Sequence, residues 1–255
     1  MTQAELKEFL DEKYYQYNKP EFIETDPIQI PHLFTKKEDI EISAFLSSTI
    51  AWGQRKTIIR NAKFLLKMMD NSPHDFLLNA NENDLRIFEN FKHRTFNGED
   101  CVYFIKSLQN IYKNHGGLQA VFYKAYKNNN EIMDSLLYFR NIFFELNFPK
   151  RTLKHISNVE KKSAAKRLNL FLMWMIRNDS RGVHFGLWRN FSSADLYIPL
   201  DVHCGNVSRS LSLLKRKQND RAAVEELTNN LKKFDNKDPV KYDFALFGIG
   251  VNEKF

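Results

Sequence analysis

Residues 163–176 read Ser-Ala-Ala-Lys-Arg-Leu-Asn-Leu-Phe-Leu-Met-Trp-Met-Ile, and this segment decides the fold that the sequence predicts. Its first two turns are small and polar, whereas the rest is apolar on all sides, which is typical of a helix whose far end is buried. Lys166 lies near the polar end, at the edge of that core. Desolvation and the neighbouring charge of Arg167 favour the neutral amine that a nucleophile requires there. An ordinary lysine at a solvated helix start is the alternative.

A basic surplus surrounds this segment. Residues 150–181 carry nine Lys or Arg residues and two acidic residues, whereas the rest of the chain carries equal numbers of each sign. The formal net charge of the chain is +7, so its whole positive surplus lies in this one stretch. A localised basic face is typical of a site that binds a polyanion.

Helical periodicity extends through the remainder of the chain, while the alternation typical of strands is almost absent. Residues 35–38 read Thr-Lys-Lys-Glu and predict a capping box before a helix over 40–50. Residues 97–100 open another helix, which ends before a Gly-Gly pair. The sequence therefore predicts an all-α fold, with 178–197 as its longest irregular connection. Further helices are expected over about 6–17, 58–69, 118–127, 132–146, 163–177, 202–214, 220–234 and 239–248.

Composition narrows the class of protein. At 255 residues with 43% apolar side chains, the chain can bury a sizeable core in one domain or two joined lobes. Its two cysteines, Cys101 and Cys204, are too few for an iron-sulfur cluster or an all-cysteine zinc site. The sequence shows neither a secretory signal nor an apolar run of about 18 residues. We therefore expect a cytoplasmic, soluble protein with reduced thiols, no metal, no cofactor and no membrane contact.

A carboxylate follows the basic stretch. Asp201 comes after Pro199, which enforces an extended approach, and before the helix expected from residue 202. This position predicts an N-cap, whose carboxylate is held ionised by helix amides and can stabilise a developing positive charge. A purely structural cap is the alternative. Asp201 and His203 do not form a metal-binding pair, because residues two apart on a helix do not share a face.

Two glycines near the end of the chain, Gly248 and Gly250, do not form a dinucleotide-binding fingerprint. The third glycine is missing, and no strand-turn-helix pattern surrounds the pair. They predict close packing at the end of the last helix.

Three segments resemble the helix-hairpin-helix DNA glycosylase superfamily. Residues 200–203, Leu-Asp-Val-His, are similar to the segment that carries its catalytic aspartate. Residues 166–169, Lys-Arg-Leu-Asn, look like the Lys-x-x-Asn that opens the helix after its hairpin. Residues 38–56 end in Trp-Gly-Gln-Arg-Lys and resemble the early family helix with a glutamine near the lesion. The chain as a whole is similar to a bacterial family of unknown function that is related to this superfamily.

The resemblance implies one glycosylase-like unit over residues 1–255, all-α and two-lobed, with the active site in a cleft between the lobes. One lobe is expected over about 39–177 and the other over 1–38 plus 178–255. The implied protein is a monomer that excises an oxidised purine such as 8-oxoguanine from damaged duplex DNA. Lys166 is then the nucleophile that forms a Schiff base, and Asp201 stabilises the cationic sugar. The other implied site residues are Gln54, His184, Trp188 and His203 as base pocket or wedge, and Lys161, Lys162 and Arg167 as contacts to the DNA backbone.

The hairpin departs from the family pattern. Its usual sequence is Leu-Pro-Gly-Val-Gly, whose glycines let backbone amides approach a DNA phosphate, but residues 156–162 contain no glycine. Lys161, Lys162 and the following helix N-terminus would replace that contact. The long separation of Lys166 from Asp201 resembles archaeal 8-oxoguanine glycosylases. The missing glycines favour an alternative, a non-catalytic nucleic-acid-binding module on the same scaffold, and a helical protein-interaction scaffold is a third possibility.

Overall fold

The computed structural model describes residues 1–253. Within them the chain forms twelve α-helices and one pair of two-residue strands, so the all-α prediction is confirmed. The described chain divides into two compact units, one built from residues 1–24 and 158–253 and the other from residues 25–157. We call them the terminal unit and the middle unit. None of the helices within residues 1–253 is long and apolar enough to cross a membrane.

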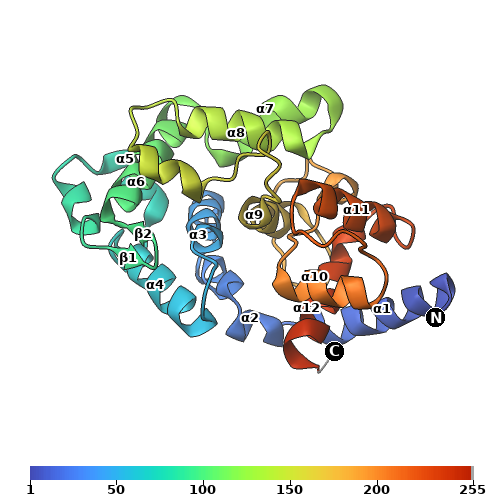
Figure 1. Ribbon diagram of the computed structural model, residues 1–255. Helices are drawn as coiled ribbons and strands as arrows, with labels where there is room; N and C mark the ends of the chain where they lie inside the picture. Colours follow the sequence, from blue (N-terminus) through green and yellow to red (C-terminus); the bar gives the residue numbers. More distant parts are fainter. Residues whose placement is uncertain (254–255) are drawn as a thin grey trace. The chain divides into compact units, whose positions relative to one another are not determined.

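The terminal unit joins the first helix of the chain to the last one. Residues 177–201 of this unit contain no α-helix and include the irregular connection predicted there. Its helices are α1 (Gln3–Tyr17), α9 (Lys166–Ile176), α10 (Val202–Ser210), α11 (Arg221–Lys232) and α12 (Asp243–Asn252), and α2 (Glu21–Thr25) ends at the boundary with the middle unit. Helix α12 packs against both α1 and α10 (Figure 1).

A glycine allows the close packing of α12 against α1. A Cβ atom on Gly248 would lie 2.2 Å from Cδ2 of Tyr17, well inside van der Waals contact. The ring of Tyr17 therefore lies directly on the backbone of α12, an approach that only glycine permits. Close packing at the end of the last helix, predicted from Gly248 and Gly250, is confirmed.

The middle unit has a core of phenylalanine rings. Phe45, Phe104 and Phe143 are fully buried. The rings of Phe104 and Phe143 meet edge to face with their centroids 4.7 Å apart, a geometry that adds to the free energy of burial. The three rings come from α3 (Lys37–Thr49), α6 (Gly98–Asn114) and α8 (Ile132–Phe143), and the other elements are α4 (Arg55–Lys67), α5 (Pro73–Asn79), α7 (Leu118–Asn129), β1 (Lys92–His93) and β2 (Phe96–Asn97). Helices α7 and α8 pack against each other (Figure 1).

Short 3-10 helices fill several of the connections in both units. They span Pro27–Gln29, Pro31–Leu33, Asp84–Phe88, Lys150–His155, Ser193–Asp195 and Pro239–Tyr242. Three of the six begin at a proline, whose fixed φ suits a helix start.

The capping box predicted over residues 35–38 is wrong. Helix α3 begins at Lys37, and Lys36 at its N-cap makes no side-chain hydrogen bond. Glu38 and Asp39 lie in the first turn instead, where the helix dipole favours negative charge. Asp39 also accepts a hydrogen bond from the amide of His74 at 2.8 Å, so this helix start is held by tertiary contact rather than by a local cap.

The units divide the chain at different residues from those expected. Residues 158–177 were expected with the middle of the chain, but they belong to the terminal unit. The amide of Arg221 donates a hydrogen bond to the carbonyl of Lys162 at 3.0 Å. At the other end of the segment, the amide of Trp188 donates to the carbonyl of Met175 at 3.0 Å. These bonds fasten α9 to the elements that follow it, so Lys166 and Asp201 share a unit.

A buried carboxylate organises the start of α6. Asp100 and Asn97 form a capping box, which confirms the helix start predicted there. The Asp100 side chain also accepts hydrogen bonds from Arg151 at 2.6 Å and Thr152 at 2.8 Å, and Nε2 of His155 lies 3.1 Å from it. Burial alone would raise the pKa of the Asp100 carboxyl. Hydrogen bonds from His155, the Asn97 amide and Thr152 outweigh burial and hold that pKa below its ordinary value.

Asp100→Asn is expected to lower the free energy of unfolding by about 1–3 kcal/mol at neutral pH, because the surrounding donors lose a charged acceptor. A carboxyl with a lowered folded pKa stabilises the fold above its unfolded pKa of about 4, and that contribution is lost as the pH falls further. In urea denaturation, the difference between variant and wild type should therefore narrow from about pH 5 to about pH 3. A difference that stays constant over this range would contradict the role of the charge.

Candidate active site

Lys166 and Asp201 lie side by side in the terminal unit. Lys166 is the first residue of α9, and Asp201 directly precedes α10. Nζ of Lys166 lies 3.4 Å from Oδ2 of Asp201, although the two residues are 35 positions apart in the sequence. Their side chains are 36% and 12% exposed, so solvent reaches the amine while the carboxylate is largely covered. The structure thus brings together the two residues that the sequence singled out for chemistry.

The two oxygens of the Asp201 carboxylate have different partners. Oδ1 accepts a hydrogen bond from the amide of Cys204 at 2.8 Å, so Asp201 is the N-cap of α10, as predicted. Oδ2 is turned toward Lys166. The helix N-terminus favours the negative charge and fixes its orientation, which leaves one oxygen for the amine. Asp201 can therefore cap α10 with one carboxylate oxygen and face Lys166 with the other.

A second carboxylate, Asp243, contacts the first turn of α10 through Cys204. The buried thiol of Cys204 donates a hydrogen bond to Oδ1 of Asp243 at 3.2 Å. Burial raises the pKa of the Cys204 thiol well above its ordinary value, and the carboxylates of Asp243 and Asp201 raise it further. The thiol therefore stays protonated and acts as a donor. Across the described part of the chain, no group of three or more His, Cys, Asp or Glu residues is arranged to hold a metal ion.

A tight turn precedes α9 at the position of the expected hairpin. The side chain of Asn158 accepts hydrogen bonds from the amides of Glu160 at 2.9 Å and Lys161 at 3.4 Å. Lys162 adopts a left-handed conformation with φ +62°, and its amide donates to the carbonyl of Val159 at 3.1 Å. The turn therefore closes without glycine, through an asparagine side chain and one strained lysine. The side chains of Lys161 and Lys162 are exposed.

The sequence of residues 26–252 matches the family described as "Protein of unknown function (DUF2400)". The chain belongs to the DUF2400 family. The match includes Lys166 and Asp201 together with the tight turn before α9. No curated protein and no solved structure matches the chain. Its chemistry therefore has to be inferred from the residues of the site.

Two of the predicted pocket residues lie in the core of this DUF2400 protein. Trp188 is fully buried, and its ring meets Phe171 of α9 edge to face at 5.3 Å. His184 is also buried, and its Nδ1 lies 3.2 Å from Nη1 of Arg177. These contacts give both residues a role inside the terminal unit, and a contact with a base stays a prediction.

The other predicted residues lie closer to the surface. His203 is exposed on α10, with Nδ1 at 3.1 Å from the carbonyl of Gly250. Arg167 is half-buried, and burial lowers the pKa of its guanidinium to about 10, so it stays charged at neutral pH. Gln54 is exposed at the start of α4 in the middle unit. His203 and Arg167 thus share a unit with Lys166 and Asp201, whereas Gln54 belongs to the other unit.

Sequence reasoning missed two residues beside the pair. Asp243 reaches Cys204, as described above, and Asn219 donates a hydrogen bond from Nδ2 to the backbone carbonyl of Asp201 at 3.1 Å. Neither residue belongs to a local motif. Asn219 lies in a polar loop that is typical of any surface connection, so only its tertiary contact distinguishes it.

Proposed function

We propose that the chain is a DNA base-excision glycosylase with AP-lyase activity, acting on an oxidised purine such as 8-oxoguanine. Lys166 is the proposed nucleophile, and Asp201 is the proposed carboxylate that stabilises positive charge on the sugar. The main support is the 3.4 Å separation of the amine and the carboxylate. In this chemistry both groups act on one carbon atom, so their side chains have to reach the same point.

The proposed reaction starts with attack on C1′ of the damaged nucleotide. The neutral amine of Lys166 forms a C1′–N bond while the bond from C1′ to the base breaks, and the base leaves with the electron pair and takes up the proton that the attacking nitrogen loses. Opening of the sugar ring gives a protonated Schiff base, whose C2′–H is acidic. Loss of that proton breaks the C3′–O bond and releases the 3′ phosphate. Oδ2 of Asp201 is the proposed group that stabilises the positive charge developing at C1′, and its 3.4 Å distance from the Lys166 amine supports this role.

Exposed cations near the pair support a DNA substrate. Lys161 and Lys162 lie in the turn that leads into α9, a few residues before Lys166. Each lysine that neutralises a phosphate releases a condensed counterion, so both would add salt-dependent affinity for duplex DNA. Arg167 is the third proposed backbone contact.

The substrate base must leave the helical stack to reach Lys166. Gln54 is the proposed filler of the gap, and the proposed base pocket includes His184, Trp188 and His203. His203 has the best support of these three, because its side chain is exposed, whereas those of His184 and Trp188 are buried.

A trapping experiment tests the proposed function. Wild-type protein is incubated with duplex DNA that carries 8-oxoguanine or an abasic site, and borohydride is added to reduce any Schiff base. We expect a covalent protein–DNA adduct on a denaturing gel with both modified duplexes, and none with the undamaged duplex of the same sequence. The abasic duplex tests the lyase step alone, because it needs no base to be recognised.

The alternatives give different results in the same experiment. A non-catalytic nucleic-acid-binding module, which the missing hairpin glycines favour, would bind duplex with salt-dependent affinity and form no adduct. A protein-interaction scaffold would show neither binding nor adduct. Either result would overturn the proposed enzyme.

A further inference from the structure

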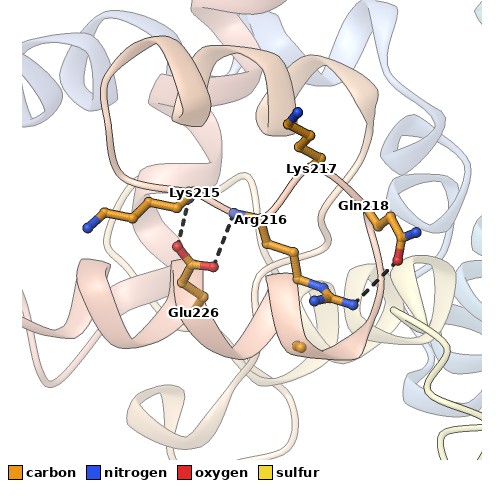
Figure 2. Close-up of a pocket in the computed structure, with 6 residues that line it drawn as sticks. Lys215, Arg216, Lys217, Gln218 and Glu226 are labelled. Carbon is orange, nitrogen blue, oxygen red and sulfur yellow. Dashed lines mark hydrogen bonds between the residues drawn. The ribbon is translucent and has the colours of Figure 1, made fainter.

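Three consecutive cations lie between α10 and α11, outside the stretch that holds the positive surplus of the sequence. They belong to residues 214–219, which we call the cationic loop. This loop borders an open hollow of about 610 Å³ in the terminal unit (Figure 2). The hollow is lined by Lys215, Arg216, Lys217, Gln218, Ala222 and Glu226.

The backbone around the cationic loop is held in place by two side chains of α11. The carboxylate of Glu226 accepts hydrogen bonds from the amides of Lys215 at 2.7 Å and Arg216 at 3.3 Å (Figure 2). Asn230 donates from Nδ2 to the carbonyl of Leu213 at 2.8 Å. These bonds fix the loop before any ligand arrives, so binding would cost little ordering entropy.

Two of the three cations in the loop have no acidic partner. Arg216 forms an ion pair with Asp220, but neither Lys215 nor Lys217 forms an ion pair with any of residues 1–253. Both lysines are exposed. The one acidic residue that lines the hollow, Glu226, is occupied by the two loop amides. Lys215 and Lys217 therefore present positive charge to solvent that is not held in an ion pair.

The shape of the loop indicates an extended anion rather than a small one. The side chains of Lys215 and Lys217 leave the loop in different directions, whereas Arg216 runs toward Gln218, whose Oε1 accepts a hydrogen bond from it at 3.4 Å (Figure 2). Such an arrangement cannot enclose a single small ion, but it can meet successive phosphates along a nucleic-acid strand.

The far end of the cationic loop is connected to the candidate active site. Asn219 donates to the carbonyl of Asp201 at 3.1 Å and accepts a hydrogen bond from Arg209 at 2.5 Å. Gly205 makes room for both side chains, because a Cβ atom there would lie 3.0 Å from Oδ1 of Asn219 and 2.8 Å from Nη1 of Arg209. The backbone of Asp201 is thus tied directly to the loop.

The cationic loop also adjoins the turn before α9. Only the N-cap residue Asp220 separates the loop from α11, and the amide of the first helical residue, Arg221, donates to the carbonyl of Lys162. The loop therefore lies between the exposed lysines of that turn and the Asp201 backbone. Backbone contacts thus connect the cationic loop to both the lysine-bearing turn and Asp201.

We infer that the cationic loop binds backbone phosphates of the DNA strand, and that Asn219 is a positioning residue that aligns the bound strand with Asp201. The inference rests on the proposed function for its substrate. Lys215 and Lys217 supply affinity without reading sequence, because phosphates carry no base information. Asn219 supplies alignment, because it joins the loop to the residue that faces the reacting carbon.

The binding role is tested with Lys215→Gln/Lys217→Gln. The control is Lys19→Gln/Lys237→Gln, which removes the same charge from two other exposed lysines of the same unit. The affinity for an abasic-analogue duplex is measured by fluorescence anisotropy at several salt concentrations. In a plot of log affinity against log salt concentration, the slope for the loop variant should be shallower than that of the wild type by about two units, one for each phosphate contact. The control variant should keep the wild-type slope. Equal slopes for the two variants would overturn the binding role, as would a wild-type protein that does not bind duplex at all.

The positioning role is tested with Asn219→Ala. The control is Asn252→Ala, which also removes a bond from an asparagine to a backbone carbonyl, that of Gly248 at 2.9 Å, but leaves Asp201 and the cationic loop untouched. At saturating protein, single-turnover adduct formation should slow about tenfold in Asn219→Ala, with an unchanged Kd and an unchanged thermal midpoint. Asn252→Ala should react at the wild-type rate. Equal rates in the two variants would overturn the positioning role.

These readouts separate the inference from the proposed function. If the wild-type protein forms no adduct but the loop variant still loses salt slope, the enzyme fails and the phosphate-binding loop stands. If the adduct forms but the slope does not change, the loop fails and the enzyme stands. If the wild-type protein forms no adduct, Asn219 has no reaction to position, and that part of the inference fails with the enzyme.

Discussion

Lys166→Ala is expected to abolish the borohydride-trapped adduct with duplex DNA that carries 8-oxoguanine or an abasic site. The amine of Lys166 is partly exposed and lies 3.4 Å from the Asp201 carboxylate, so it is the proposed attacking group. Alanine lacks the nitrogen that forms the C1′ bond, and no Schiff base can then be reduced at this position. The adduct is quantified on a denaturing gel, with at least a hundredfold loss expected.

Two control variants show whether this loss is specific. Lys161→Ala removes an exposed lysine from the turn before α9 and should weaken duplex binding while the adduct still forms at saturating protein. Asp201→Asn keeps an oxygen that can cap α10 but removes the charge, so the fold should persist while base release slows by about 100-fold or more. An adduct of normal yield in Lys166→Ala would place the nucleophile elsewhere in the chain.

Much of the helical architecture could be predicted from the sequence, because its signals are local. The capping box formed by Asn97 and Asp100 marked the start of α6, and Asp201 marked the start of α10. The capping box predicted before α3 was wrong, because the start of this helix is held by a tertiary hydrogen bond from the amide of His74 to Asp39, 35 residues away. The strands β1 and β2 were missed because two residues each are too few to show alternation.

The candidate active site could be predicted only in part. Nothing in the spacing of Lys166 and Asp201 indicates that they meet, and the family resemblance alone paired them. Asn219 and Asp243 were missed because each acts through a tertiary hydrogen bond, to the Asp201 carbonyl and to the Cys204 thiol. A single sequence holds no signal for such contacts.

The count of charges along the chain did not predict which positive side chains reach the surface. Arg177 belongs to the basic stretch 150–181, yet its side chain is fully buried and paired with carboxylates. It contributes nothing to a surface that attracts a polyanion. The exposed and unpaired Lys215 and Lys217 lie outside that stretch. Burial and pairing, which decide where positive charge is available, emerge only from the fold.

Arg177 is the centre of a buried polar cluster at the end of α9. Its Nε donates to both oxygens of Asp238 at 3.0 and 2.9 Å, and its Nη1 lies 2.7 Å from Asp179. Its Nη2 donates to the hydroxyl of Tyr14 at 3.0 Å. Burial alone would lower the pKa of the Arg177 guanidinium, but Asp238 and Asp179 outweigh burial and raise it. The cluster ties α1, α9 and the segment before α12 into one unit.

Arg177→Met is therefore expected to lower the free energy of unfolding by about 3–5 kcal/mol, measured by urea denaturation at neutral pH. Methionine fills much of the volume, but it leaves the largely buried carboxylates of Asp179 and Asp238 without their cation. The loss should be partly reversed in the triple variant that adds Asp179→Asn and Asp238→Asn, because the uncompensated charges are then gone.

Arg221→Met is the matched control for this stability prediction. Arg221 pairs with Glu225 on the surface of α11, and the two side chains are 37% and 38% exposed. Water screens such a pair, so its loss should change the free energy of unfolding by no more than about 0.5 kcal/mol. A similar small change in Arg177→Met would mean that the buried cluster adds no net stability. A large loss that the two asparagines do not relieve would point to packing around Arg177, rather than unpaired charge, as its cause.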